Sequence, residues 1–185
     1  MRKLVSVGVL VLGLCLAAAA ADDVPKLEVF GGVSWLHIDS MGLAGVKTNY
    51  MGWDAEGQFN LNRWLGVTAD IGGNYGRLVP DTPTTHSYTY VFGPTISYRA
   101  HSSTLFAHTL FGANSTNIIS GGGSSDSAFA MAWGGGIDVR INSTFFLRLG
   151  QLDWLYTRHD LRSVGLKDHQ NNIRYAGGIV INLGH

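Results

Sequence analysis

Charged side chains are scarce in this sequence: they make up 14% of its 185 residues, against about 25% in a typical globular protein. Acidic and basic residues balance at 13 each, so no basic surface of the kind that binds nucleic acid is indicated. Proline is also rare, with 4 residues, whereas glycine reaches 25 and aromatic residues 11%. This composition excludes a disordered chain, and the scarcity of proline excludes Pro/Gly low-complexity sequence.

Cysteine is nearly absent, and the only one, Cys15, lies in a segment typical of a secretory signal peptide. That segment starts with two basic residues, continues through an apolar stretch and ends in a run of alanines. The apolar stretch is shorter than the ~20 residues that a membrane-anchoring helix needs. We therefore expect residues 1–21 to be a cleaved signal peptide and residues 22–185 to form one exported domain without disulfides.

Long apolar runs are missing after residue 21, so no transmembrane helix is predicted. What recurs instead is a strict alternation of apolar and polar residues. In residues 53–61 the odd positions are Trp, Ala, Gly, Phe and Leu, and the even positions are Asp, Glu, Gln and Asn. A strand points successive side chains to opposite faces, so this pattern predicts one apolar and one polar face.

Eight segments show this period of two. We expect strands at 27–40, 53–61, 65–75, 87–98, 104–114, 127–140, 145–158 and 171–183. The connections between them alternate between long and short: 41–49, 62–64, 77–86, 99–103, 115–126, 141–144 and 159–170. Hairpin-linked strands favour an up-and-down barrel, and short turns at one end with long loops at the other are typical of outer-membrane barrels. The sequence thus predicts an all-β protein, an eight-stranded antiparallel transmembrane β-barrel.

The polar face carries charges of both signs. Because eight strands leave an interior just wide enough for side chains, we expect a lumen filled by an Arg–carboxylate network rather than a wide channel. The predicted members are Glu28, Asp54, Glu56, Asp70, Asp138, Arg140, Arg148 and Arg174.

The apolar face carries large aromatics toward strand ends, as expected where rings sit among lipid headgroups. The predicted membrane-interface aromatics are Trp35, Trp53, Trp64, Tyr75, Tyr88, Tyr98, Phe129, Phe145 and Tyr175. The alternative is a soluble barrel with its faces inverted, in which Trp53 and Phe59 would line an interior pocket for an apolar ligand.

Two places disturb the pattern. Pro94 cannot donate a ladder hydrogen bond, so we expect a bulge or an interrupted pairing there. Arg148 and Asp153 are five residues apart and cannot both face inward in an unbroken strand. Either a bulge separates them, or Asp153 lies near the outer rim.

Several of these segments resemble the small OmpA-like and opacity-protein-like outer-membrane β-barrel proteins. The resembling segments are the opening strand 27–32, the turn 60–66, and segments 92–94, 132–140 and 174–180. The resemblance implies an outer-membrane location and insertion by the barrel-assembly machinery. The sequence ends in Leu-Gly-His, which departs from the terminal aromatic residue that many such proteins carry.

Enzymatic activity is not predicted. Some eight-stranded outer-membrane barrels modify lipid A with a Ser/His pair and an acid, and histidines 37, 86, 101, 108, 159 and 169 are the candidates. No G-x-S-x-G motif is present, and no histidine and acid spacing matches a standard metal site. We expect no catalytic residues, cofactor or metal.

Three functions remain open: a barrel whose outer loops bind an unidentified extracellular ligand, a narrow porin-like channel for small solutes, and the soluble carrier. We favour the first, as a monomer in the lipid bilayer.

Overall fold

The computed structural model describes residues 24–38, 48–76, 85–118, 124–158 and 169–184. The predicted signal peptide lies outside these residues. No helix among them is long and apolar enough to cross a membrane.

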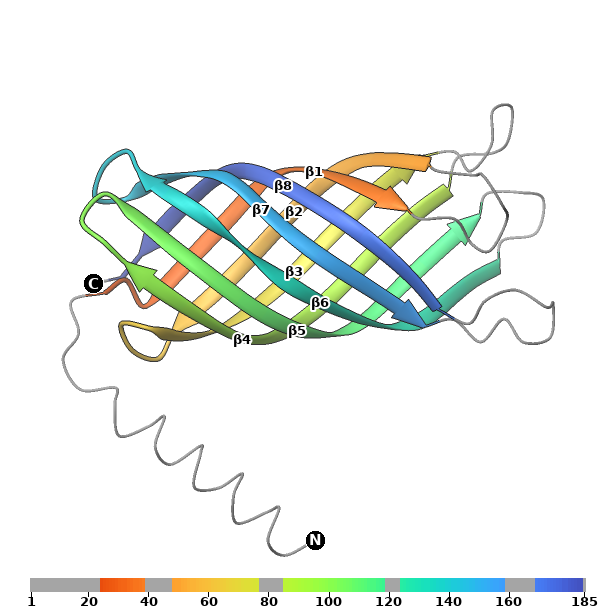
Figure 1. Ribbon diagram of the computed structural model, residues 1–185, viewed down its shortest axis with the longest axis horizontal. Coiled ribbons are helices and arrows are strands. Elements are labelled where there is room, and N and C mark those ends of the chain that lie inside the picture. The colour runs from red at the N-terminus through yellow and green to blue at the C-terminus, as the bar shows by residue number, and fades with distance from the viewer. Residues whose placement is uncertain (1–23, 39–47, 77–84, 119–123, 159–168, 185) are drawn as a thin grey trace, which may run out of the picture.

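Eight antiparallel strands form a closed barrel in which each strand pairs with its neighbours in the chain (Figure 1). The barrel closes because β1 pairs with β8 from Leu27↔Leu183 to Ile38↔Asn172. Closure leaves no free sheet edge, which is the condition for strands to cross a lipid bilayer. The predicted architecture is confirmed. The strands are β1 Leu27–Ile38, β2 Thr48–Asn60, β3 Leu65–Gly76, β4 Thr85–Arg99, β5 Ser103–Ile118, β6 Ser124–Arg140, β7 Phe145–Arg158 and β8 His169–Leu183.

The largest difference from the prediction at a single strand end is in β2, which begins at Thr48 rather than at residue 53. The third long connection, expected at 115–126, is also shorter than predicted. Strand β5 continues to Ile118 and β6 begins at Ser124, and the two pair as far as Ile118↔Ser124. The sequence of this segment, Ser-Thr-Asn-Ile at 115–118 and Ser-Ser-Asp-Ser at 124–127, shows no alternation of apolar and polar residues, so the extension could not be predicted from it.

Two of the short turns are built in the same way. Asn62 Oδ1 accepts hydrogen bonds from the amides of Trp64 and Leu65, at 2.9 and 2.8 Å. Asn142 Oδ1 accepts the equivalent bonds from the amides of Thr144 and Phe145. An asparagine that bonds to the backbone two and three residues ahead fixes a tight turn, and it sets the register of the strands on both sides.

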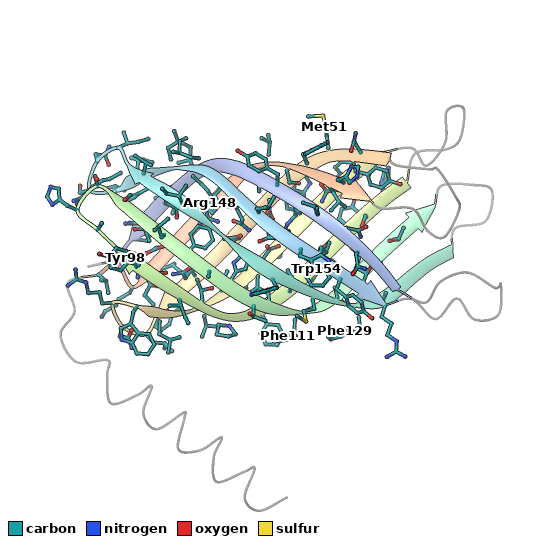
Figure 2. All side chains as sticks on the ribbon, viewed as in Figure 1. Met51, Tyr98, Phe111, Phe129, Arg148 and Trp154 are labelled. Atoms are coloured by element: carbon teal, nitrogen blue, oxygen red, sulfur yellow. The ribbon has the colours of Figure 1, made fainter. Side chains whose placement is uncertain are left out.

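Burial follows the predicted period of two along most of the barrel. In β3, for example, Thr68 and Asp70 are buried, whereas Val67 and Ile71 are exposed. The apolar face therefore points outward and the polar face inward. Figure 2 shows Met51, Phe111 and Phe129 projecting from the outside of the barrel, with Arg148 inside its outline.

The lumen also contains two apolar clusters that the alternation does not predict. One consists of Leu36, Tyr50, Val91, Leu110, Ala130, Ala132 and Leu155. The other consists of Phe30, Ala176 and Val180, with Phe146 packed against it. The expectation of a lumen filled by charged residues is therefore incomplete, because apolar side chains also fill it.

Both expected irregularities have a structural counterpart. Strand β4 pairs with β5 at Phe92 and again at Thr95 in the same register, with no partners between, so the ladder is interrupted at Pro94 without a bulge. In β7 the register toward β8 shifts between Arg148 and Gln151. This bulge adds one residue, so that Arg148 and Asp153 both face the lumen.

Candidate functional site

The centre of the lumen is organised around two buried arginines, Arg148 and Arg174. Their side chains are 4% and 1% exposed. Each is surrounded by carboxylates from strands far apart in the sequence. A buried charge is tolerated only when it is paired and hydrogen-bonded, so the partners determine whether this arrangement is stable.

Arg174, on β8, contacts three carboxylates. It donates from Nη1 to Asp70 Oδ1 at 3.0 Å and from Nη2 to Asp153 Oδ2 at 2.7 Å. It also donates from Nη2 to Asp70 Oδ2, and its Nη1 lies 3.4 Å from Asp54 Oδ1. His108 completes the group, with Nε2 2.8 Å from Asp153 Oδ1. We call Arg174, Asp54, Asp70, Asp153 and His108 the Arg174 centre.

Arg148, on β7, has two carboxylates and two aromatic rings. It donates from Nη1 to Glu56 Oε2 at 2.6 Å and from Nε to Asp138 Oδ1 at 2.8 Å. Its guanidinium carbon lies 4.3 Å from the ring centroid of Phe30 and 4.2 Å from that of Phe106. A cation over an aromatic face is attracted to the ring, so this arginine is held by both ion pairing and stacking.

Gln151 joins the two arginine groups. Its Oε1 accepts a hydrogen bond from Arg148 at 2.5 Å, and its Nε2 donates to Glu56 Oε1 at 2.6 Å and to Asp153 Oδ2 at 2.9 Å. We call Arg148, Glu56, Asp138 and Gln151 the Arg148 centre. Because Gln151 bonds to members of both centres, the polar side chains form one connected layer across the lumen.

Glycines make room for this layer. A Cβ at Gly72 would lie 3.2 Å from Arg174 Nη1, and one at Gly134 would lie 2.2 Å from Asp153 Oδ1. A side chain at Gly134 therefore cannot coexist with the present position of Asp153. The high glycine content serves, at these inward positions, to admit large charged side chains into a narrow barrel.

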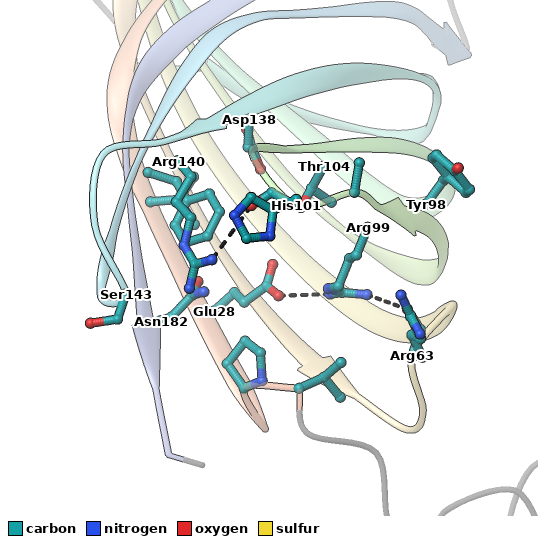
Figure 3. Close-up of a pocket in the computed structure, with 15 residues that line it drawn as sticks. Glu28, Arg63, Tyr98, Arg99, His101, Thr104, Asp138, Arg140, Ser143 and Asn182 are labelled. Atoms are coloured by element: carbon teal, nitrogen blue, oxygen red, sulfur yellow. Dashed lines mark hydrogen bonds and ion pairs between the residues drawn. The ribbon is translucent and has the colours of Figure 1, made fainter.

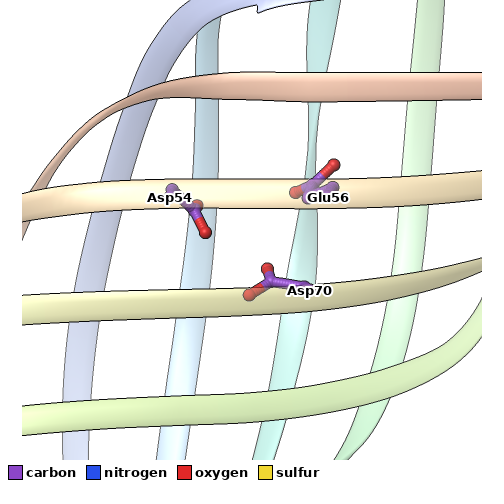
Figure 4. A group of neighbouring side chains, drawn as sticks. All are labelled: Asp54, Glu56 and Asp70. Atoms are coloured by element: carbon purple, nitrogen blue, oxygen red, sulfur yellow. The ribbon is translucent and has the colours of Figure 1, made fainter.

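Three carboxylates from neighbouring strands converge within the layer: Asp54 and Glu56 from β2, and Asp70 from β3 (Figure 4). One oxygen from each lies within 4.8 Å of the other two. Asp54 and Asp70 contact Arg174, and Glu56 contacts Arg148. Asp54 Oδ2 is buried and has no hydrogen-bond partner.

A cavity of about 610 Å³ opens at the short-turn end of the barrel (Figure 3). Glu28 faces it and accepts a hydrogen bond from Arg99 Nη2 at 2.6 Å. Arg140 is exposed there and lies 3.4 Å from the carbonyl oxygens of His101 and Asn142. Asp138 lies at the inner wall of the cavity, so water can approach the Arg148 centre from this end.

The predicted lumen residues therefore occupy three places. Asp54, Asp70 and Arg174 form one buried centre, and Glu56, Asp138 and Arg148 form the other. Glu28 lines the cavity at the short-turn end, which we call the mouth of the barrel, and it pairs there with Arg99. Arg140 was expected in the network and does not join it, because it is the last residue of β6 and its side chain reaches solvent.

Three buried members were absent from the predicted set: His108, Gln151 and Asp153. The bulge in β7 changes which residues face inward after Arg148. Whether Gln151 and Asp153 face the lumen could therefore be assigned only once that bulge was located. The position of His108 on the inward face of β5 was available from the alternation of that strand.

The nine predicted interface aromatics are all on the outward face. Trp64, Tyr98 and Phe145 lie at the short-turn end, and Trp53 Nε1 donates to the hydroxyl of Tyr75 at 3.1 Å. Tyr175 lies over the β7 bulge, where its hydroxyl donates to the carbonyl of Leu149 at 2.7 Å. The outward face also carries Trp133 and Trp154, which are directly paired between β6 and β7 and were absent from the predicted set.

The hydrogen bonds of the described histidines show no Ser–His pair. His37 Nδ1 lies 2.7 Å from Asn49 Oδ1 on the outside, and His108 contacts Asp153 in the lumen. Neither histidine has a serine hydroxyl as a partner among the residues that the structure describes.

Comparison with known proteins identifies the family. The model of the outer membrane protein β-barrel domain matches residues 7–184. The chain belongs to this family. As an outer membrane β-barrel protein, it lies in the outer membrane with its apolar face toward lipid, as the sequence predicts. A comparison with curated protein sequences gives no match.

Solved structures share the fold. Neisserial surface protein A superposes with a TM-score of 0.69 at 10% identity, covering 85% of this chain and 97% of its own. The attachment invasion locus protein Ail of Yersinia pestis, in complex with the heparin analogue sucrose octasulfate, gives a TM-score of 0.60 at 16% identity, covering 85% and 98%. The outer membrane protein OprG of Pseudomonas aeruginosa gives 0.50 at 9% identity, covering 88% and 97%. At these identities the similarity concerns the fold.

Proposed function

We propose that this outer-membrane barrel is a rigid, sealed support for surface loops that bind an extracellular partner. The observation that carries the proposal is the filling of the lumen. Two buried arginine centres form a connected polar layer, and apolar clusters also occupy the interior. A solute crossing this lumen would have to break several buried ion pairs, each of which is costly to separate.

The binding role is assigned to the four long connections of the barrel. Residues 39–47, 77–84, 119–123 and 159–168 join strands at the end opposite the short turns, which in this family's architecture faces the outside. The similarity to Ail, described as an attachment invasion protein and bound to a heparin analogue, supports a role in surface attachment. Charges within these connections balance, so their sequence does not favour a polyanion over other partners.

The binding role is tested by displaying the protein on a Gram-negative laboratory host. A matched variant carries, in place of each long connection, a tight turn with the sequence of residues 61–64 or 141–144. We expect cells with the full chain to adhere to cultured epithelial cells or to immobilised heparin, and cells with the short-turn variant not to adhere. Equal adhesion by both, with equal amounts of folded barrel, would overturn the proposal.

Sealing is tested separately by recording single-channel currents across planar bilayers. We expect the wild-type barrel to show no steady conductance, and Arg148→Ala to introduce transient openings. A stable open channel in the wild type would instead support the porin-like function, without deciding whether the loops bind a partner.

Assembly and oligomeric state complete the proposal. The barrel is inserted by the barrel-assembly machinery and functions as a monomer, since every strand already has two partners within one chain. Depletion of that machinery in the display host should abolish the heat-modifiable folded form. Chemical crosslinking on intact cells should give a single band at the mass of one chain.

A further inference from the structure

The charges of the buried layer do not balance. The described lumen residues include five carboxylates, Asp54, Glu56, Asp70, Asp138 and Asp153, against two guanidinium groups, Arg148 and Arg174. The layer therefore retains an excess of negative charge in a setting where uncompensated charge is strongly disfavoured.

The excess is concentrated at one point. Asp54, Glu56 and Asp70 place one oxygen each within 4.8 Å of one another. Figure 4 shows the three side chains on two neighbouring strands. Arg174 already serves Asp153 as well as Asp70, and it approaches Asp54 only at 3.4 Å. The carboxylate with the weakest partner in this group is thus Asp54.

Asp54 provides a second, independent observation. Its side chain is 0% exposed, and its Oδ2 has no hydrogen-bond partner. A buried carboxylate oxygen that accepts no hydrogen bond calls for another positive partner.

The spacing of the oxygens is compatible with a calcium-sized partner. Calcium binds oxygen ligands at about 2.3–2.6 Å, which allows two ligands on opposite sides of the ion to be about 5 Å apart. Magnesium requires about 2.0–2.1 Å and holds its water ligands tightly, so it suits a smaller and wetter site. Three carboxylates within 4.8 Å fit the larger ion.

We propose that Asp54, Glu56 and Asp70 bind a calcium-sized divalent cation inside the lumen. Asp54 supplies its free Oδ2, while Glu56 and Asp70 use oxygens that also accept hydrogen bonds from the arginines. The two positive charges of the ion offset most of the excess of three negative charges that the five carboxylates carry over the two guanidinium groups. The ion then acts as a structural bond between β2 and β3 within the sealed layer.

The location of the site predicts how it is loaded. Along β2, Tyr50 of the larger apolar cluster precedes the acidic pair, and Glu56 is covered by Arg148 on the other side. The ion should therefore enter while the barrel folds and exchange slowly afterwards. Calcium added before folding should have a larger effect than calcium added later.

The experiment refolds the full chain into zwitterionic detergent with calcium, with magnesium or with a chelator, and then removes free ions by desalting. Elemental analysis should find roughly one calcium ion per folded barrel. The midpoint of the heat-induced shift on an unheated gel should rise by several degrees with calcium, and less with magnesium. Asp54→Asn should lose the bound calcium and the calcium-dependent shift, whereas Glu28→Gln, at the mouth, should retain both.

Two results would overturn the proposal. The first is a wild-type barrel that folds without stoichiometric calcium and whose midpoint follows pH alone, which would assign the neutralising role to protons. The second is calcium bound equally by the wild type and Asp54→Asn, which would place the ion elsewhere. The metal content of the wild type decides the first result even if the variant does not fold.

Discussion

The two arginine centres of the lumen are stabilised in different ways. Arg174 depends on ion pairs and hydrogen bonds with aspartates alone: three aspartates surround it, and its side chain is 1% exposed. Arg148 has two carboxylates, a glutamine and two flanking aromatic rings. Moreover, its partner Asp138 borders the cavity at the short-turn end.

This difference shows that burial alone does not determine how much a charge matters. If an arginine is lost, its former partners must find other donors or water. Asp153 keeps His108 and Gln151. Asp54 and Asp70 have no other side-chain donor among the described residues of the layer, whereas Glu56 keeps Gln151 and Asp138 is near solvent. We therefore expect the Arg174 centre to be the less replaceable of the two.

The largest effect is expected for Arg174→Met. The substitution leaves Asp54, Asp70 and Asp153 buried without a guanidinium partner, and breaking a buried ion pair costs about 3–5 kcal/mol. The free energy of unfolding, from urea titrations of the barrel in lipid vesicles, should fall by at least this amount. Adding Asp70→Asn should recover part of the loss. An unchanged unfolding midpoint would show that Arg174 does not stabilise the layer.

Arg148→Met should cost less, about 2–3 kcal/mol, in the range for hydrogen bonds to charged groups. Glu56 keeps its hydrogen bond from Gln151, and the methionine side chain can still pack between Phe30 and Phe106. The same urea titration measures this loss of unfolding free energy. We predict that it is smaller than the loss caused by Arg174→Met. A larger loss for Arg148→Met would reverse the ranking of the two centres.

The sequence was sufficient to predict the barrel fold, because the alternation of apolar and polar residues is a property of each strand by itself. Residues 53–61 show it most clearly, and the carboxylates of that segment do face inward. The alternation was less informative in strands whose inward and outward faces are both apolar. In β1, Phe30 and Leu36 point inward while Val33 and Trp35 point outward, so alternation could not reveal the apolar clusters of the lumen.

The partners within the site could not be read from the sequence, because they depend on the closing of the barrel. Arg174 meets Asp70 across 104 residues, and Arg148 meets Glu56 across 92. Alternation says which face a side chain occupies but not its height or its neighbours. Arg140 illustrates this. The alternation places its side chain on the inward face, but the residue lies at the end of β6, outside the buried layer.

Stacking on the Arg148 side can be isolated with Phe106→Leu. The change removes a cation–π contact worth about 0.5–2 kcal/mol, and we expect a loss of that size. In an Arg148→Met background the same change should cost measurably less, because no cation remains over the ring. A double-mutant cycle on unfolding free energies gives the coupling. Equal losses in both backgrounds would mean that Phe106 contributes through packing alone.

The smallest effect is expected at Gly72, beside the Arg174 centre. A Cβ there would lie 3.2 Å from Arg174 Nη1 and 3.5 Å from Asp54 Oδ1, so the guanidinium must move by a few tenths of an ångström. Because this arginine has no aromatic rings to hold it, we expect Gly72→Ala to cost less than about 1 kcal/mol after relaxation. Gly57→Ala is the matched control on the outward face, where a Cβ meets nothing within 4 Å, and it should be neutral or slightly stabilising. A severe loss at Gly72 alone would show that charge by itself positions Arg174 as rigidly as stacking positions Arg148.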